Sequence, residues 1–182
     1  RLNAEHLLAH VLGKKNRIEL YLEFERPLGE KERAPLRDLV RQRGEGRPLQ
    51  HLLGTVEFLG YTFATDPRAL IPRPETEQLV ELVLAAGDFH DLLDVGTGSG
   101  VIALSLALKR LTVSVTGCDI SAPALALAAE NATRHALSDR VLFMESDLLE
   151  SIRGPFDAVV ANLPYIPAAD IPALFREVGH DP

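Results

Sequence analysis

The stretch Leu92-Leu93-Asp94-Val95-Gly96-Thr97-Gly98-Ser99-Gly100 is a short apolar segment that runs directly into a glycine-rich turn. The apolar residues predict a strand over 92–95, and the residues after the turn predict a helix over about 101–109. A glycine-rich turn at a helix N-terminus lets the backbone approach a ligand closely and favours anionic atoms. The dinucleotide fingerprint Gly-x-Gly-x-x-Gly is not met, because its third glycine would fall on Val101. The turn therefore predicts a ligand-binding loop of a different kind.

Strand and helix patterns alternate from this loop to the end of the chain. Further strands are predicted over 113–118, 141–144 and 156–161, with a second helix over about 123–136. This alternation predicts an α/β, Rossmann-like domain in which a parallel sheet carries helices on its faces. A complete sheet of this class has more strands than these. We therefore expect the chain to be part of a longer protein, with strand 156–161 as an uncovered hydrophobic edge.

The loop sequence Asp-x-Gly-x-Gly-x-Gly resembles the first motif of class I S-adenosylmethionine-dependent methyltransferases. In that class the early acidic residue, here Asp94, lies near the methionine portion of the cofactor. Asp119 ends the second predicted strand, where ligands of such sheets bind, and is placed to accept hydrogen bonds from ribose hydroxyls. Asp147 follows the third strand and could meet an adenine amino group. Ordinary loop capping is the alternative for Asp119 and Asp147.

The last predicted strand, which begins near Asp157 and which we expect to be buried, ends in Asn162-Leu163-Pro164-Tyr165. Asn162 offers a side-chain carbonyl, Leu163 a backbone carbonyl, and Tyr165 an aromatic face. Pro164 has no N–H and biases the residue before it toward an extended backbone. Together these groups could hold a planar group that bears an NH2, such as an amide or an exocyclic amine. The alternative is that Asn and Pro only terminate the strand.

Composition and charge exclude several classes of protein. The 182 residues are 46% hydrophobic and 25% charged, which is typical of a globular protein with a real core. No apolar run approaches the roughly 18 to 20 residues of a membrane span, and the N-terminus shows no signal sequence, so we expect a cytoplasmic protein without membrane contact. A single cysteine excludes a disulfide framework, and His6 and His10 have no third partner, so no metal site is expected.

A formal net charge of −7 argues against broad binding to a phosphate backbone. A local basic patch stays open as an RNA contact, with a solvated helix face as the alternative; its members are Arg33, Arg37, Arg41, Arg43 and Arg47. Direct nucleic-acid binding is therefore not expected to be the main activity.

The chain divides into three predicted regions. Residues 1–46 show short helical patterns broken by glycine and proline, which indicate a small helical domain for substrate recognition or a structural cap. Residues 47–74 combine a predicted β-hairpin around Leu59-Gly60 with a proline-rich linker. A helix is predicted to open at Pro74, and residues 75–182 form the α/β domain.

Nearly the whole chain resembles the HemK/PrmC family of peptide chain release factor glutamine methyltransferases. The most specific part is the run Leu70-Ile71-Pro72-Arg73-Pro74-Glu75-Thr76-Glu77, which is not a general methyltransferase feature. The preceding segment, Gln50 to Gly54 with Glu57-Phe58, Gly60 and Phe63, supports the same resemblance. The family resemblance implies methyl transfer from S-adenosylmethionine to the side-chain amide of a glutamine in a Gly-Gly-Gln motif, during translation termination.

The resemblance also implies roles for single residues. Asp94, Gly96, Thr97, Gly98, Gly100 and Asn162 would line the cofactor site, Asp119 would bind the ribose, and Asp147-Leu148 would lie beside the adenine. Asn162 to Tyr165 would hold the glutamine, with Arg73 and Glu75 on the substrate side.

The chain departs from the family at one of these positions. The family usually has Asn-Pro-Pro-Tyr, and Leu163 stands here in place of the first proline. Because only a backbone carbonyl is required there, the acceptor should be preserved. Asn-Leu-Pro-Tyr also occurs in ribosomal RNA adenine N6-methyltransferases, which leaves an RNA-modifying enzyme as an alternative. A cofactor-binding module without catalysis is a second alternative.

Overall fold

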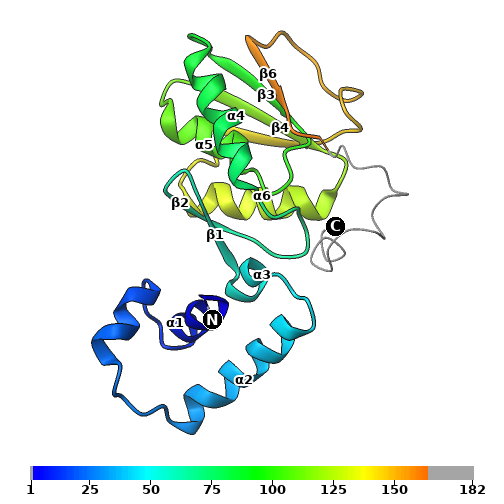
Figure 1. Ribbon diagram of the computed structural model, residues 1–182. Helices are drawn as coiled ribbons and strands as arrows, with labels where there is room; N and C mark the ends of the chain where they lie inside the picture. The colour runs from blue at the N-terminus through cyan, green and yellow to red at the C-terminus, as the bar shows by residue number, and fades with distance from the viewer. Residues whose placement is uncertain (1, 164–182) are drawn as a thin grey trace.

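The computed structural model describes residues 2–163 of the chain, so the predictions for Pro164 and Tyr165 lie outside the described residues. Its centre is a parallel sheet of four strands in the order β5-β4-β3-β6 (Figure 1). The strands are β3 (Asp91–Val95), β4 (Ser114–Asp119), β5 (Val141–Glu145) and β6 (Ala158–Ala161). Val95 pairs with Cys118 of β4 on one side and with Ala161 of β6 on the other. The predicted parallel arrangement is confirmed, and the carboxyl ends of these strands meet at one edge.

The helices that were predicted from the apolar patterns are present. They are α4 (Pro74–Ala85), α5 (Val101–Lys109) and α6 (Ala122–Arg134). Pro74 occupies the first turn of α4, where its missing N–H costs nothing. Ser121 caps α6, because its hydroxyl oxygen accepts a hydrogen bond from Ala124 N at 3.3 Å. Helix α5 is buried over most of its length and contacts both α4 and α6.

The two faces of the sheet are covered differently. Leu92, Val115 and Val160 belong to the large core that the helices share. Leu93, Val95 and Cys118 point to the other face, where Ile152 and Phe156 from the β5–β6 loop pack against them. Among residues 2–163, helices therefore cover one face only, whereas the sequence predicted helices on both.

Strand β6 also differs from its prediction as a buried strand. It is shorter than predicted, and Val160 is its one buried residue. Val159 points to the loop-covered face and is 61% exposed. Within the described residues β6 pairs only with β3, so its outer side carries no neighbouring strand. The apolar pattern identified the strand correctly, but burial depends on which elements cover it.

The predicted hairpin is confirmed as β1 (Thr55–Phe58) and β2 (Tyr61–Ala64), which pair antiparallel. Leu59 and Gly60 connect them with φ of 50° and 80°, the positive values that a tight two-residue turn requires. Phe58 and Phe63 are buried and meet edge to face with centroids 6.4 Å apart. Both rings belong to the same core as α5, so the hairpin is part of the sheet domain's packing.

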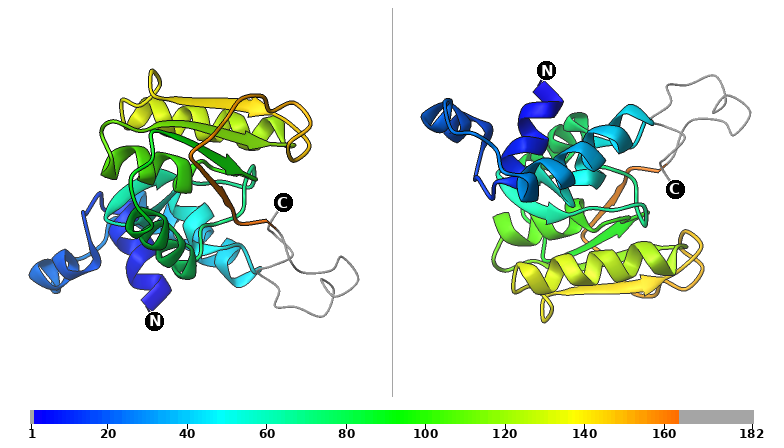
Figure 2. Two further views of the ribbon diagram at one scale, coloured as in Figure 1. Left: turned by 90° about the horizontal axis from the view of Figure 1, so that it is seen from above. Right: turned by 90° about the horizontal axis from the view of Figure 1, so that it is seen from below.

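The N-terminal residues form a separate group of helices joined to the hairpin through α3 (Figure 1). Seen from below, these helices lie nearest the viewer, in front of the sheet (Figure 2, right). They are α1 (Leu2–Val11), the 3-10 helix η1 (Arg17–Glu23), α2 (Glu30–Gly44) and α3 (Leu49–Leu53). In the described part of the chain, none of the helices has the length and apolar character needed to traverse a lipid bilayer.

Most arginines of α2 form ion pairs with acidic neighbours. Arg33 pairs with Glu30 at 3.2 Å, Arg41 pairs with Asp38 at 2.7 Å, and Arg37 also reaches Glu30. Exposed pairs of this kind contribute little stability. They do lower the net positive potential that a nucleic acid would meet.

Candidate cofactor and substrate site

The glycine-rich loop lies at the carboxyl end of β3 and connects this strand to α5. Its glycines 96, 98 and 100 have φ of 71°, 55° and 80°, values that side chains with a Cβ rarely adopt. The N–H groups of Gly96 and Thr97 both donate to Cys118 O, at 2.8 and 2.9 Å. A Cβ built on Gly98 would meet no atom within 4 Å. The loop is therefore tied to β4 on one side and open to a ligand above Gly98.

Asp94 supports this loop from inside the protein. It is fully buried, and its Oδ2 accepts hydrogen bonds from Thr97 Oγ1 at 2.6 Å and from Ala103 N at 3.2 Å. Burial raises the pKa of the Asp94 carboxyl to about 6, against the lowering effect of these two donors. Its Oδ1 is buried and receives no hydrogen bond within residues 2–163. A buried acceptor left unpaired is suited to a donor or cation that a ligand would bring.

Asp119 ties the loop to the end of the neighbouring strand. Its Oδ2 accepts from Gly98 N at 2.8 Å, and its Oδ1 accepts from Ser121 N at 2.9 Å. A carboxylate has about four lone-pair sites, so acceptor positions remain for hydroxyl groups of a ligand. The structure thus brings Asp119 to the glycine loop, as the sequence predicted from their spacing. Its hydrogen bond to Gly98 N, which supports the glycine loop, was not predicted.

Asp147 and Leu148 lie at the same edge of the sheet, after β5. Both are exposed, and Leu148 has a φ of 48°. Ser146, directly before them, donates its N–H to Asp119 O at 3.0 Å. This bond places the start of the β5–β6 loop beside the end of β4. The two residues are therefore accessible at the edge where the glycine loop opens.

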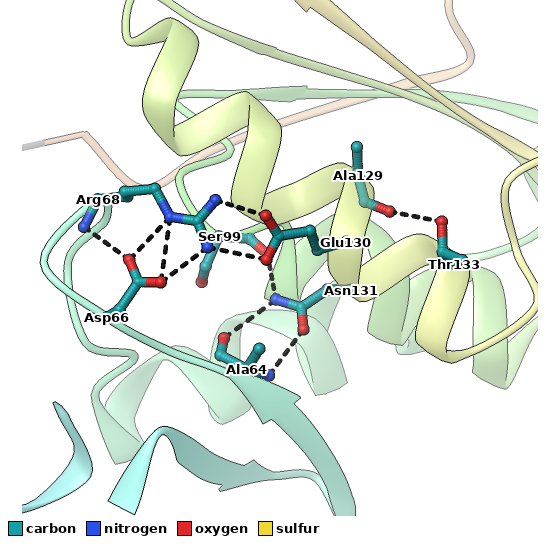
Figure 3. A network of polar contacts seen from close by, with 8 residues as sticks. All are labelled: Ala64, Asp66, Arg68, Ser99, Ala129, Glu130, Asn131 and Thr133. Atoms are coloured by element: carbon teal, nitrogen blue, oxygen red, sulfur yellow. Dashed lines mark hydrogen bonds and ion pairs between the residues drawn. The ribbon is translucent and has the colours of Figure 1, made fainter. Parts of the chain in front are cut away.

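Asn131 is a site residue that the sequence analysis missed. It is fully buried in α6, where its Nδ2 donates to Ala64 O at 3.1 Å and to Ser99 O at 3.0 Å (Figure 3). Its Oδ1 accepts from Ala64 N at 2.7 Å. One side chain thus joins the end of the hairpin to the glycine loop. The available signal was an asparagine on the apolar stripe of an alanine-rich helix.

An ion-pair network lies beside Asn131 on the surface (Figure 3). Arg68 pairs with Glu130 at 2.6 Å and with Asp66 at 2.7 Å. Glu130 and then Asp66 raise the pKa of the Arg68 guanidinium, and Arg68 lowers the pKa of the Asp66 carboxyl. The network fastens the segment after the hairpin onto α6, close to where Asn131 holds Ala64.

The end of β6 brings Asn162 and Leu163 to the glycine loop. A Cβ built on Gly96 would lie 2.7 Å from Leu163 Cδ2, so the leucine side chain lies directly over that glycine. Asn162 is exposed, and its Nδ2 donates to Thr76 Oγ1 at 3.3 Å. This hydrogen bond leaves the Asn162 Oδ1 available as an acceptor. The first two residues of the predicted clamp therefore lie next to the predicted cofactor loop.

The first turn of α4 lies at the same place. Arg73 is the N-cap residue of this helix, and Glu75 follows in its first turn; both are exposed. Glu77 Oε1 accepts from Leu59 N at 2.8 Å, which links the helix start to the hairpin turn. The segment that was singled out as most specific in the sequence therefore contacts both the hairpin and the end of β6.

Comparisons with known proteins agree with this arrangement. The methyltransferase small domain family matches residues 74–174, and the PrmC N-terminal domain family matches residues 1–54. The release factor glutamine methyltransferase of Chlorobaculum tepidum is 47% identical over an alignment of 191 residues. The match covers 98% of this chain and 65% of that protein. The protein of the same name from Geobacter sulfurreducens is 44% identical over 180 residues, covering 98% of this chain and 62% of that protein.

A solved RNA methyltransferase from Salinibacter ruber, in complex with S-adenosyl-L-homocysteine, is also similar in part. It is 25% identical with a TM-score of 0.46, over 56% of this chain and 65% of that chain. The chain spans a little under two thirds of the length of the two curated relatives, at 65% and 62%. One family covers its sheet domain and the other its N-terminal helices, so the chain belongs to the methyltransferase small domain family and carries the PrmC N-terminal domain.

Proposed function

We propose that this protein transfers a methyl group from S-adenosylmethionine to the side-chain amide nitrogen of a glutamine in the Gly-Gly-Gln motif of a peptide chain release factor. The observation that supports the proposal is the position of the β6 end: the Leu163 side chain lies over Gly96 and Asn162 contacts Thr76, so the proposed amide clamp would adjoin the proposed cofactor loop. Relatives that match nearly the whole chain bear the name of that activity.

The residues of the loop fit S-adenosylmethionine, which supplies a methyl group on a positively charged sulfur when bound. The open space above Gly98 accommodates a ligand close to the backbone. The unpaired, buried Oδ1 of Asp94 suits the cationic amino group of the methionine portion. Asp119 would hold the ribose, and Asp147-Leu148 would lie beside the adenine.

The strand end would orient the substrate amide. An amide nitrogen is a poor nucleophile because its lone pair is delocalised into the carbonyl, so orientation matters more than deprotonation. Asn162 Oδ1 and the Leu163 carbonyl would accept the two amide hydrogens, and Tyr165 would pack on the amide plane. This is catalysis by positioning and electrostatics, and it needs no strong base before the transfer.

We therefore propose that the partner is a release factor and that this protein acts in the cytoplasm. Residues 1–46 of this chain would be the domain that recognises the release factor. Residues 47–74 would connect this domain to the methyltransferase domain of residues 75–182. Arg73 and Glu75, both exposed at the start of α4, would contact the substrate. The paired arginines of α2 give an RNA substrate less support than a protein substrate.

A direct test uses the full-length protein with labelled S-adenosylmethionine and two substrates, a release factor and an adenine-bearing ribosomal RNA. Mass spectrometry should find one added methyl group on the glutamine of the Gly-Gly-Gln motif and none on the RNA. If only the RNA is methylated, the proposal is wrong and the protein is an RNA adenine N6-methyltransferase. Cofactor binding without transfer to either substrate would support a non-catalytic module.

A further inference from the structure

We infer that Thr76 is a positioning residue that holds the Asn162 carboxamide with its oxygen toward the substrate. The inference rests on the proposed function, because it explains how the proposed amide clamp is kept in one orientation. It also gives a role to one residue of the run Leu70 to Glu77, the most specific part of the family resemblance in the sequence.

The contact joins two parts of the chain that are 86 residues apart. Thr76 is buried in the first turn of α4, with an exposed fraction of 8%, whereas Asn162 is exposed at the end of β6. The Asn162 Nδ2 lies 3.3 Å from Thr76 Oγ1. The hydrogen bond therefore joins a buried hydroxyl to an exposed carboxamide. Because the buried side chain has less freedom to move, we take Thr76 as the residue that orients Asn162.

The hydroxyl is held in place by the helix that carries it. Thr76 N donates to Arg73 O at 3.0 Å, which closes the first turn of α4. Glu77 accepts from Leu59 N at 2.8 Å, and Val80 is fully buried one turn later. Contacts to the hairpin and to the core therefore fix the start of α4 before any substrate binds.

The end of β6 has less support of its own. Ala161 pairs with Val95 on one side, and no strand pairs with the other side among the described residues. A carboxamide can rotate by half a turn, which exchanges its acceptor oxygen for its donor NH2. In that flipped state Asn162 would present a donor to the hydrogens of the substrate amide. In the observed state Thr76 Oγ1 accepts from Nδ2, so the Oδ1 faces away from Thr76 and stays available to the substrate. The flipped state would require the Thr76 hydroxyl to turn and donate to Oδ1 instead.

The test compares Thr76→Val, which keeps the shape of the side chain without the hydroxyl, with Thr76→Ser, which keeps the hydroxyl. Single-turnover methylation of a release factor at saturating S-adenosylmethionine should slow by about tenfold in Thr76→Val and by less than about threefold in Thr76→Ser. The Kd for S-adenosylmethionine should stay within about twofold in both. Thr133→Val, at an exposed threonine of α6, is the matched control and should keep the parental rate.

A purely structural role for Thr76 would change the melting temperature or the cofactor Kd together with the rate, and that result would overturn the inference. A parental rate in Thr76→Val, alongside a slow Asn162→Ala protein, would also overturn it while leaving the proposed function intact. A parental rate in Asn162→Ala would instead refute the proposed clamp. If Thr76→Val does not fold, Thr76→Ala and Thr76→Ser differ only in the hydroxyl, and equal rates for these two would count against the inference.

Discussion

The glycine loop and the end of β6 lie side by side but are supported very differently. Asp94, Asp119 and Asn131 hold the loop through hydrogen bonds of 2.6 to 3.2 Å, and two of these three side chains are fully buried. At the strand end, the side-chain hydrogen bond of Asn162 is 3.3 Å long and Asn162 itself is exposed. A loop that binds a small cofactor can be preformed. The proposed site for a side chain of another protein would have to stay open.

The largest effect on folding is expected at Asn131, which supports the loop from α6. Asn131→Ala would leave Ala64 N, Ala64 O and Ser99 O without their partner in the protein interior. Since a buried polar group left unpaired costs about 1 to 3 kcal/mol, we expect the free energy of unfolding to fall by about 3 kcal/mol. Urea denaturation followed by circular dichroism measures this change.

Thr133→Ala is the matched control on the same helix. The Thr133 hydroxyl donates to Ala129 O at 3.0 Å on the exposed side of α6. Its loss should change the free energy of unfolding by no more than about 0.5 kcal/mol. Equal changes in the two variants would show that Asn131 is an ordinary helix residue.

A smaller effect, which depends on pH, is expected at Asp94. Its pKa is raised from 3.8 to about 6 by burial, so the folded protein binds this proton more tightly than the unfolded chain does. As pH rises from 4 to 7 the folded state must ionise a buried group, and this group lowers the free energy of unfolding by about 2 kcal/mol. Asp94→Asn does not titrate, so it should gain about that much relative to the parent over this range.

Urea denaturation of both proteins at pH 4 and pH 7 checks the prediction for Asp94. Other titrating groups contribute equally to the two proteins and cancel in the difference. A difference in unfolding free energy that stays constant with pH would mean that Asp94 does not carry a raised pKa in the folded protein.

The smallest effect is expected at Asp119, and it concerns cofactor affinity. Asp119→Ala removes the acceptor for Gly98 N and the proposed ribose contact, so the Kd for S-adenosylmethionine should rise by about tenfold, or about 1.4 kcal/mol. Asp157 offers a close control, because its Oδ2 also accepts two backbone N–H groups, from His90 and Asp91, but at the amino end of β3. Calorimetry should show an unchanged Kd for Asp157→Ala; a tenfold loss in both variants would remove the special role of Asp119.

Much of the sheet domain could be predicted because its signals are local. The apolar run of 92–95 and the glycines after it determine strand, turn and helix start over a few residues, and the Leu59-Gly60 turn identifies the hairpin in the same way. Asp119 could be assigned to the loop edge because parallel strands bring their carboxyl ends together.

The contacts that could not be predicted connect residues far apart in the chain. Asn131 and Ala64 are 67 residues apart, and the apolar stripe on which the asparagine lies does not reveal its hydrogen-bond partners. Thr76 and Asn162 meet only because α4 packs against the core while β6 joins β3. The exposure of Val159 likewise depends on which elements cover its face of the sheet, which an apolar run does not reveal.

The most direct test of the account measures two quantities in Asn162→Ala of the full-length protein, with Asp119→Ala beside it. We predict that Asn162→Ala keeps the parental Kd for S-adenosylmethionine within about twofold, while its single-turnover rate on a release factor falls by about 10² or more. Asp119→Ala should show the reverse, with weaker cofactor binding and a nearly parental rate at saturation. Methylation of the release factor by Asn162→Ala at the parental rate would contradict the account, and Asn162 would then only terminate its strand.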